Sequence, residues 1–93
     1  MVSSVTLKHS LTYDGATLHV YHANKGEGLP KHEHEYSHAT ICHSGLCVVR
    51  VEGKELIMNK NTQPVNLLGG KWHEIEALED GTVFVNVFAE GKY

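Results

Sequence analysis

The chain has 93 residues, of which 41% are hydrophobic and 20% are charged, and its 8 Lys and Arg against 11 Asp and Glu give a formal net charge of −3. This composition is typical of one globular domain spanning residues 1–93 and excludes an intrinsically disordered chain. The slight negative charge argues against nucleic acid as a partner, and no apolar run approaches the roughly 18 residues of a membrane span.

Short segments rich in Val, Thr, Tyr and Ile, separated by glycine or asparagine, predict an all-β fold. Turn signals such as Asp14-Gly15 and Glu52-Gly53 lie between these segments. In chain order, the predicted strands are residues 5–9, 16–23, 38–43, 46–52, 54–59, 63–68, 72–78 and 82–89. Residues 24–37 show no strand pattern and are predicted to form a polar loop. Seven or eight short strands in one small chain indicate a sandwich or a barrel.

Histidine is unusually frequent, with eight residues, as many as Lys and Arg together. His32, His34 and His38 form the pattern H-x-H-x-x-x-H. In an extended segment residues i and i+2 point to the same side, so His32 and His34 converge. His38 opens the next predicted strand, and His73 stands at the head of another. Imidazoles from adjacent strands indicate a site for one divalent transition metal (Fe, Mn, Ni, Cu or Zn), although H-x-H alone is equally compatible with a solvated loop.

Residues 26–45 resemble the first motif of the cupin superfamily, G-x5-H-x-H-x3-4-E-x6-G, with His38 in place of the glutamate. The two glycines and the two histidines of the motif fall in register, which makes this motif specific. The resemblance implies the double-stranded β-helix, a jelly-roll barrel, and a bound divalent metal. It assigns four metal ligands: His32, His34, His38 and His73.

Residues 68–77 resemble the second cupin motif, P-x-G-x2-H-x3-N, more weakly. Gly70 and His73 match it, whereas Leu68 replaces the proline and Ala77 replaces the asparagine. With four neutral histidines in place of three and a glutamate, a divalent metal keeps its full charge of +2. That charge strengthens the attraction for an anionic ligand and lowers the pKa of metal-bound water.

Alternation along the strands predicts which side chains line the interior. If His38 faces the cavity, Thr40 and Cys42 do so as well, and a two-residue turn at Ser44-Gly45 pairs Cys42 with Cys47. The predicted pocket residues are Thr40, Cys42, Cys47, Val49, Ile75, Val83, Val85 and Val87, with Val51 and Ala77 on the same inner faces. An apolar cavity with one metal fits a small, weakly polar molecule.

The segment 16–23 places His19 and Tyr21 on one face and Leu18, Val20 and His22 on the other. Alternation does not tell which face is inside. If His19 and Tyr21 face the metal, they are candidates for acid–base catalysis or for hydrogen bonding to the metal ligands. Cross-strand packing or a surface position is the more frequent role of such residues.

The inward placement of Val85 puts Phe84, Asn86 and Phe88 on the outer face of the last strand. Two large apolar groups there suggest a subunit interface, and the resemblance to small cupins implies a homodimer. The alternative is that the aromatic rings pack under the N-terminal segment of the same chain.

Residues 1–11 lack the hydrophobic core of a secretory signal, so we expect a cytoplasmic protein. In that compartment Cys42 and Cys47 are expected as a reduced pair, although the predicted register also permits a cross-strand disulfide.

Three functions are compatible with these sequence features. The first is a metal-dependent oxidoreductase, similar to a dioxygenase, that acts on a small, weakly polar substrate. The second is a non-catalytic metal-binding or ligand-sensing module. The third is an isomerase or epimerase that uses His19 and Tyr21 without a metal.

Overall fold

The computed structural model describes residues 2–32 and 37–89, and within them every regular element is a β-strand. The strands are β1 (Ser3–Ser4), β2 (Leu7–Tyr13), β3 (Ala16–Ala23), β4 (Glu27–His32), β5 (His38–Ser44), β6 (Cys47–Val51), β7 (Lys54–Met58), β8 (Val65–Leu67), β9 (His73–Ala77) and β10 (Thr82–Ala89). The predicted all-β class is confirmed. No helix among these residues is long and apolar enough to cross a membrane.

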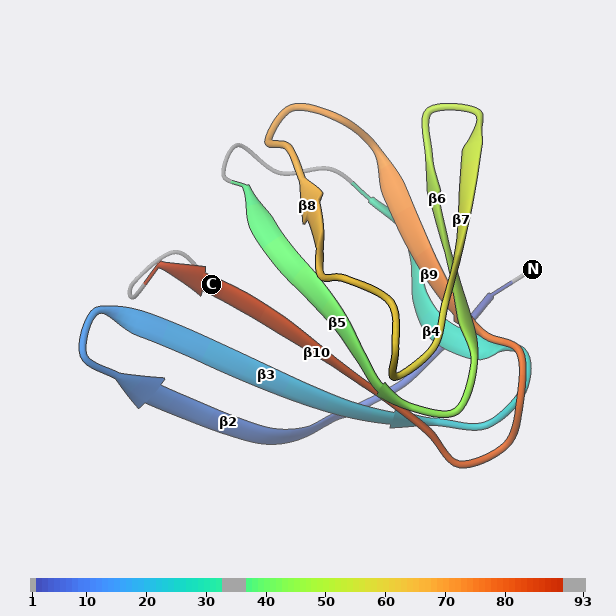
Figure 1. Cartoon of the computed structure of the whole chain (residues 1–93), viewed down its shortest axis with the longest axis horizontal. Helices are drawn as coiled ribbons and strands as arrows, with labels where there is room; N and C mark the ends of the chain where they lie inside the picture. The colour runs from blue at the N-terminus through green and yellow to red at the C-terminus, as the bar shows by residue number, and fades with distance from the viewer. Residues whose placement is uncertain (1, 33–36, 90–93) are drawn as a thin grey trace.

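The strands form two five-stranded sheets (Figure 1). Sheet A has the order β1-β4-β9-β6-β7, and sheet B has the order β2-β3-β10-β5-β8. All neighbouring strands are antiparallel except β1 and β4. Strands that are consecutive in sequence therefore often belong to different sheets, which brings distant segments together between the layers.

The core fills the space between the sheets with alternate residues of their strands. On β9 and β10 the pattern of buried and half-buried residues alternates without a break over His73–Ala77 and Thr82–Phe88. The best buried apolar side chains are Cys42, Cys47, Val49, Met58, Leu67, Ile75, Ala77 and Phe84. The expected inward orientation of Thr40, Cys42, Cys47, Val49, Ile75 and Ala77 agrees with their burial.

Strand β4 lies in the segment that was expected to be a loop, so that expectation is wrong for Glu27–His32. The sequence hides this strand because Gly28 and Pro30 interrupt it. Proline has no N–H for the ladder, and the pairing of β4 with β9 is irregular between Leu29 and His32, where Pro30 lies. Gly28 is required at its position, because a Cβ there would collide with the carbonyl group of Ile75.

The predicted pairing of Cys42 with Cys47 in a hairpin is also wrong. Strand β5 pairs with β10 and β8 in sheet B, whereas β6 pairs with β7 and β9 in sheet A. The turn at Ser44-Gly45 therefore carries the chain from one sheet to the other. Both thiols are buried and are not joined in a disulfide.

The expected orientation of β10 is reversed. Val83, Val85 and Val87 are only half-buried and lie on the outer face, whereas Phe84 and Phe88 are buried between the sheets. The Phe84 ring stacks on that of Tyr21 at 5.1 Å. Phenylalanine buries more apolar area than valine, so the stable orientation is the one that places the aromatic rings inside. A subunit interface built on Phe84 and Phe88 is thereby excluded, whereas Val5 of the N-terminal segment does pack against the core cluster that contains Phe84.

Candidate metal centre

Three of the four predicted ligands lie at strand ends on the same side of the barrel. His32 ends β4, His73 begins β9, and these two residues are directly paired across sheet A. His38 begins β5 in sheet B. His34 lies outside the described residues. The predicted site is thus built where the two sheets face one another.

The imidazole of His73 contacts the imidazoles of both His38 and His32. Nε2 of His38 lies 3.4 Å from Nε2 of His73, and the ring centroids of His32 and His73 are 4.3 Å apart. His38 and His73 are both buried, with 3% and 1% of their surface exposed. Two nitrogen ligands, each about 2.0–2.1 Å from a common zinc ion, lie about 3–3.4 Å apart. The spacing of the two Nε2 atoms therefore suits a shared metal ion.

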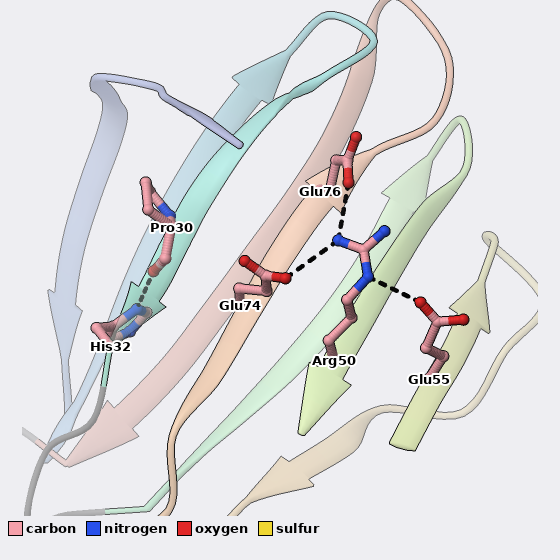
Figure 2. Close-up of polar contacts among 6 residues, drawn as sticks. All are labelled: Pro30, His32, Arg50, Glu55, Glu74 and Glu76. Atoms are coloured by element: carbon pink, nitrogen blue, oxygen red, sulfur yellow. Dashed lines mark hydrogen bonds and ion pairs between the residues drawn. The ribbon is translucent and has the colours of Figure 1, made fainter. Parts of the chain in front are cut away.

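The second ring nitrogen of two of these histidines faces a backbone carbonyl. Nδ1 of His32 lies 2.7 Å from the Pro30 oxygen (Figure 2), and Nδ1 of His73 lies 3.2 Å from the Lys71 oxygen. A carbonyl oxygen only accepts, so each Nδ1 carries the hydrogen and donates it. That arrangement leaves the Nε2 lone pair for a metal and is the usual support of a ligating histidine.

His38 has a side-chain support instead. Its Nδ1 lies 3.4 Å from Oγ1 of Thr40, and the Thr40 hydroxyl donates to Oδ1 of Asn86 at 2.8 Å. Thr40 and Asn86 are both completely buried. Nδ2 of Asn86 is buried as well and has no hydrogen-bond partner within residues 2–32 and 37–89.

No group of three or more His, Cys, Asp or Glu side chains in the described part of the chain is arranged to hold a metal by itself. Because His34 falls outside that part, the complete set of four ligands stays a prediction. The rings of His32 and His73 are nevertheless oriented by backbone carbonyls, which is the kind of support that a ligating histidine has.

His19 and Tyr21 both face the interior between the sheets. They are 8% and 4% exposed, and the Tyr21 hydroxyl lies 3.5 Å from Nδ1 of His19. The His19 ring also packs edge-on against Phe88, with centroids 4.8 Å apart. Burial lowers the pKa of His19, which keeps this imidazole neutral near pH 7. A neutral, buried imidazole beside a phenol is able to accept or donate a proton.

The two cysteines have the opposite character to a nucleophile. Burial raises the pKa of Cys47 to about 12 and also raises the pKa of Cys42. Reactive cysteines require the thiolate, so these two thiols act as small apolar core residues. Whether they and the buried Thr40, Val49 and Ile75 line a ligand cavity stays a prediction.

Asn86 is the residue near the site whose position the sequence did not predict. It was placed outside because Val83, Val85 and Val87, on the opposite face of the strand, were expected to point inward. A signal was present: one amide stands in the middle of an otherwise apolar strand, Thr82–Ala89. A polar residue within such a pattern is most stable inside only when it finds a hydrogen-bond partner, here Thr40.

Comparison of the sequence with protein-family models and with curated proteins finds no match. Solved structures share the fold. KdgF from Halomonas sp. has a TM-score of 0.79 at 16% identity, over 87% of this chain and 74% of that one. A protein with a double-stranded β-helix domain from Klebsiella pneumoniae has a TM-score of 0.76 at 20% identity, over 95% and 78%. A cupin protein from Bacteroides fragilis has a TM-score of 0.70 at 19% identity, over 87% and 71%. The double-stranded β-helix expected from the sequence is confirmed.

Proposed function

We propose that this chain, which has the cupin fold, binds one divalent transition metal through His32, His34, His38 and His73. The observation that carries the proposal is the 3.4 Å separation of the Nε2 atoms of His38 and His73. The Nδ1 atom of His73 donates to a carbonyl, and that of His38 faces the Thr40 hydroxyl, so both lone pairs point toward the shared space. A divalent cation between these two nitrogen atoms would be held by both lone pairs.

The activity that we propose for the loaded site is that of a metal-dependent oxidoreductase, similar to a dioxygenase. When bound, the metal supplies Lewis-acid or redox chemistry at the coordination positions that the protein leaves open. The chain's own residues orient the ligand imidazoles and exclude water. The buried Val49 and Ile75, paired across β6 and β9, make this interior suited to a small, weakly polar substrate.

Asn86 supports the binding of an oxygen-containing molecule in this interior. A buried amide N–H without an acceptor costs about 1–3 kcal/mol. Nδ2 of Asn86 is such a group, and it lies on the side chain that also holds Thr40 beside His38. We assign it as a donor to an oxygen atom of the substrate or of a water that the substrate displaces.

The metal content of the purified chain and the coordination number of the metal test the proposal. We expect one transition-metal ion per chain, and we expect His38→Ala and His73→Ala to lose it. His43→Ala is the matched control, because His43 is exposed on β5. Six-coordinate metal with exchangeable water supports the oxidoreductase, and a closed four-coordinate zinc favours the non-catalytic binding module. A chain that takes up no divalent metal contradicts both.

One observation favours a second candidate, an isomerase or epimerase that needs no metal. His19 and Tyr21 both face inward, and acid–base catalysis by this pair requires that orientation. In this case His19→Gln and Tyr21→Phe abolish turnover, whereas removal of the metal leaves it unchanged. Loss of turnover on chelation, with restoration by added metal, rejects the isomerase.

A further inference from the structure

We propose that Thr40 and Asn86 are positioning residues that hold the hydrogen of the His38 imidazole on Nδ1 and direct Nε2 toward His73. The inference rests on the proposed function, because this role is to prepare His38 for the metal. The position of the hydrogen can nevertheless be measured in the metal-free chain. The chain of contacts runs from β5 to β10. Thr40 and Asn86 are directly paired across these strands in sheet B.

The direction of the hydrogen bonds follows from the chemistry of the three groups. Asn86 Oδ1 only accepts, and it lies 2.8 Å from the Thr40 hydroxyl, so that hydroxyl donates its one hydrogen to Asn86. Oγ1 of Thr40 is then left with lone pairs alone, and it faces His38 Nδ1 at 3.4 Å. An acceptor at this place favours the tautomer with hydrogen on Nδ1, which exposes the Nε2 lone pair. Asn86 therefore acts on His38 through Thr40.

We call the hydrogen-bonded set of Asn86, Thr40 and His38 the relay. Its burial stabilises this arrangement of donors and acceptors. All three residues are at most 3% exposed, so bulk water does not compete for their hydrogen bonds. Nδ1 of His32 and Nδ1 of His73 donate to backbone carbonyls, which no substitution of a side chain removes. Nδ1 of His38 faces a side chain instead, so its orientation should respond to substitution of Thr40.

The hydrogen position is tested by long-range proton–nitrogen NMR of the 15N-labelled, metal-free chain at a mildly alkaline pH. We expect the wild type to carry the His38 hydrogen on Nδ1, and Thr40→Val to give a mixture of tautomers. Thr40→Ser, which keeps the hydroxyl, restores the wild-type pattern. Thr17→Val is the matched control, because Thr17 is a buried threonine on β3 whose hydroxyl contacts Thr12.

Metal affinity is the second readout. We expect Thr40→Val and Asn86→Leu to weaken zinc binding about 10–100-fold, the usual effect of losing the support of a ligating histidine. If Thr40→Val keeps the wild-type tautomer, the relay is rejected. If the tautomer changes as expected but no variant, nor the wild type, binds metal, the relay stands and the proposed function fails.

Discussion

Nε2 of His38 and Nε2 of His73 lie 3.4 Å apart, although 35 residues and two different sheets separate them. The approach follows from the crossing of the chain between the sheets at Ser44-Gly45 and from the strand starts at His38 and His73. Two buried imidazoles at this distance form the most specific feature of the candidate metal centre.

Removal of metal is expected to destabilise the wild-type chain. A ligand that binds only the folded state at 100 times its Kd adds about 2.7 kcal/mol to the free energy of unfolding. Added Zn²⁺ should therefore raise the Tm of the wild type, and a chelator should reverse the change. His38→Ala and His73→Ala should show no such rise, whereas exposed His43→Ala should behave as the wild type. An equal rise in all four chains would place the metal elsewhere.

Gly28→Ala tests whether the packing of β4 on β9 positions His32. The added Cβ collides with the Ile75 carbonyl, so the strands must separate. We expect a loss of about 1–3 kcal/mol in thermal or urea unfolding, as for other overpacked sites, together with weaker metal binding. Gly53→Ala is the control. It strains a turn with φ of 86° but has no atom near its Cβ, so it should lower stability and leave metal affinity unchanged.

Arg50 joins three strands on the outer face of sheet A (Figure 2). Its guanidinium lies 2.8 Å from Glu55, 3.2 Å from Glu74 and 2.8 Å from Glu76, and these hydrogen bonds raise the pKa of Arg50 above its ordinary value. Arg50→Met leaves Glu74 and Glu76 facing each other on β9 without a cation. We expect a loss of about 1–2 kcal/mol in urea unfolding at low salt, and less at 1 M salt.

Glu55→Gln provides the comparison for Arg50. Glu55 is 62% exposed, so solvent screens its ion pair and the loss should stay below about 0.5 kcal/mol. Equal losses in Glu55→Gln and Arg50→Met would show that the two carboxylates on β9 contribute nothing further.

Stability is expected to fall at alkaline pH because of the buried thiols. Desolvation, followed by the neighbouring Cys42, raises the pKa of Cys47 from 9.0 to about 12. The folded state thus holds this proton more tightly than the unfolded state. The stabilising effect is complete below pH 9 and is lost as the pH rises toward 12, by up to about 1.4 kcal/mol per pH unit.

Urea unfolding between pH 8 and 11 measures this dependence. The Cys47→Ala chain should be less stable at pH 8, because it has a small cavity, but its stability should decline less steeply above pH 9. The difference between the two chains isolates Cys47 from the lysines and tyrosines that also titrate in this range. Parallel curves for the two chains would contradict the raised pKa of Cys47.

Local sequence pattern was sufficient for the strands whose apolar residues alternate without interruption. Residues 16–23 and 82–89 were predicted with the observed bounds. β4 was not predictable in the same way, because Gly28 and Pro30 interrupt its side-chain pattern while its partner β9 supplies the pairing. Interactions with a distant strand override local propensity in such a segment.

The sequence by itself determined the all-β class, the cupin-like spacing of the histidines and the alternation within each strand. Only the tertiary structure decided which face of β10 is inside, because alternation is symmetric and the choice depends on packing against Tyr21 and Thr40. That choice brought Asn86 into contact with Thr40 beside His38 and left Val85 on the outer face of sheet B. Side-chain periodicity is a local property, whereas burial is decided by the distant strands that a face meets.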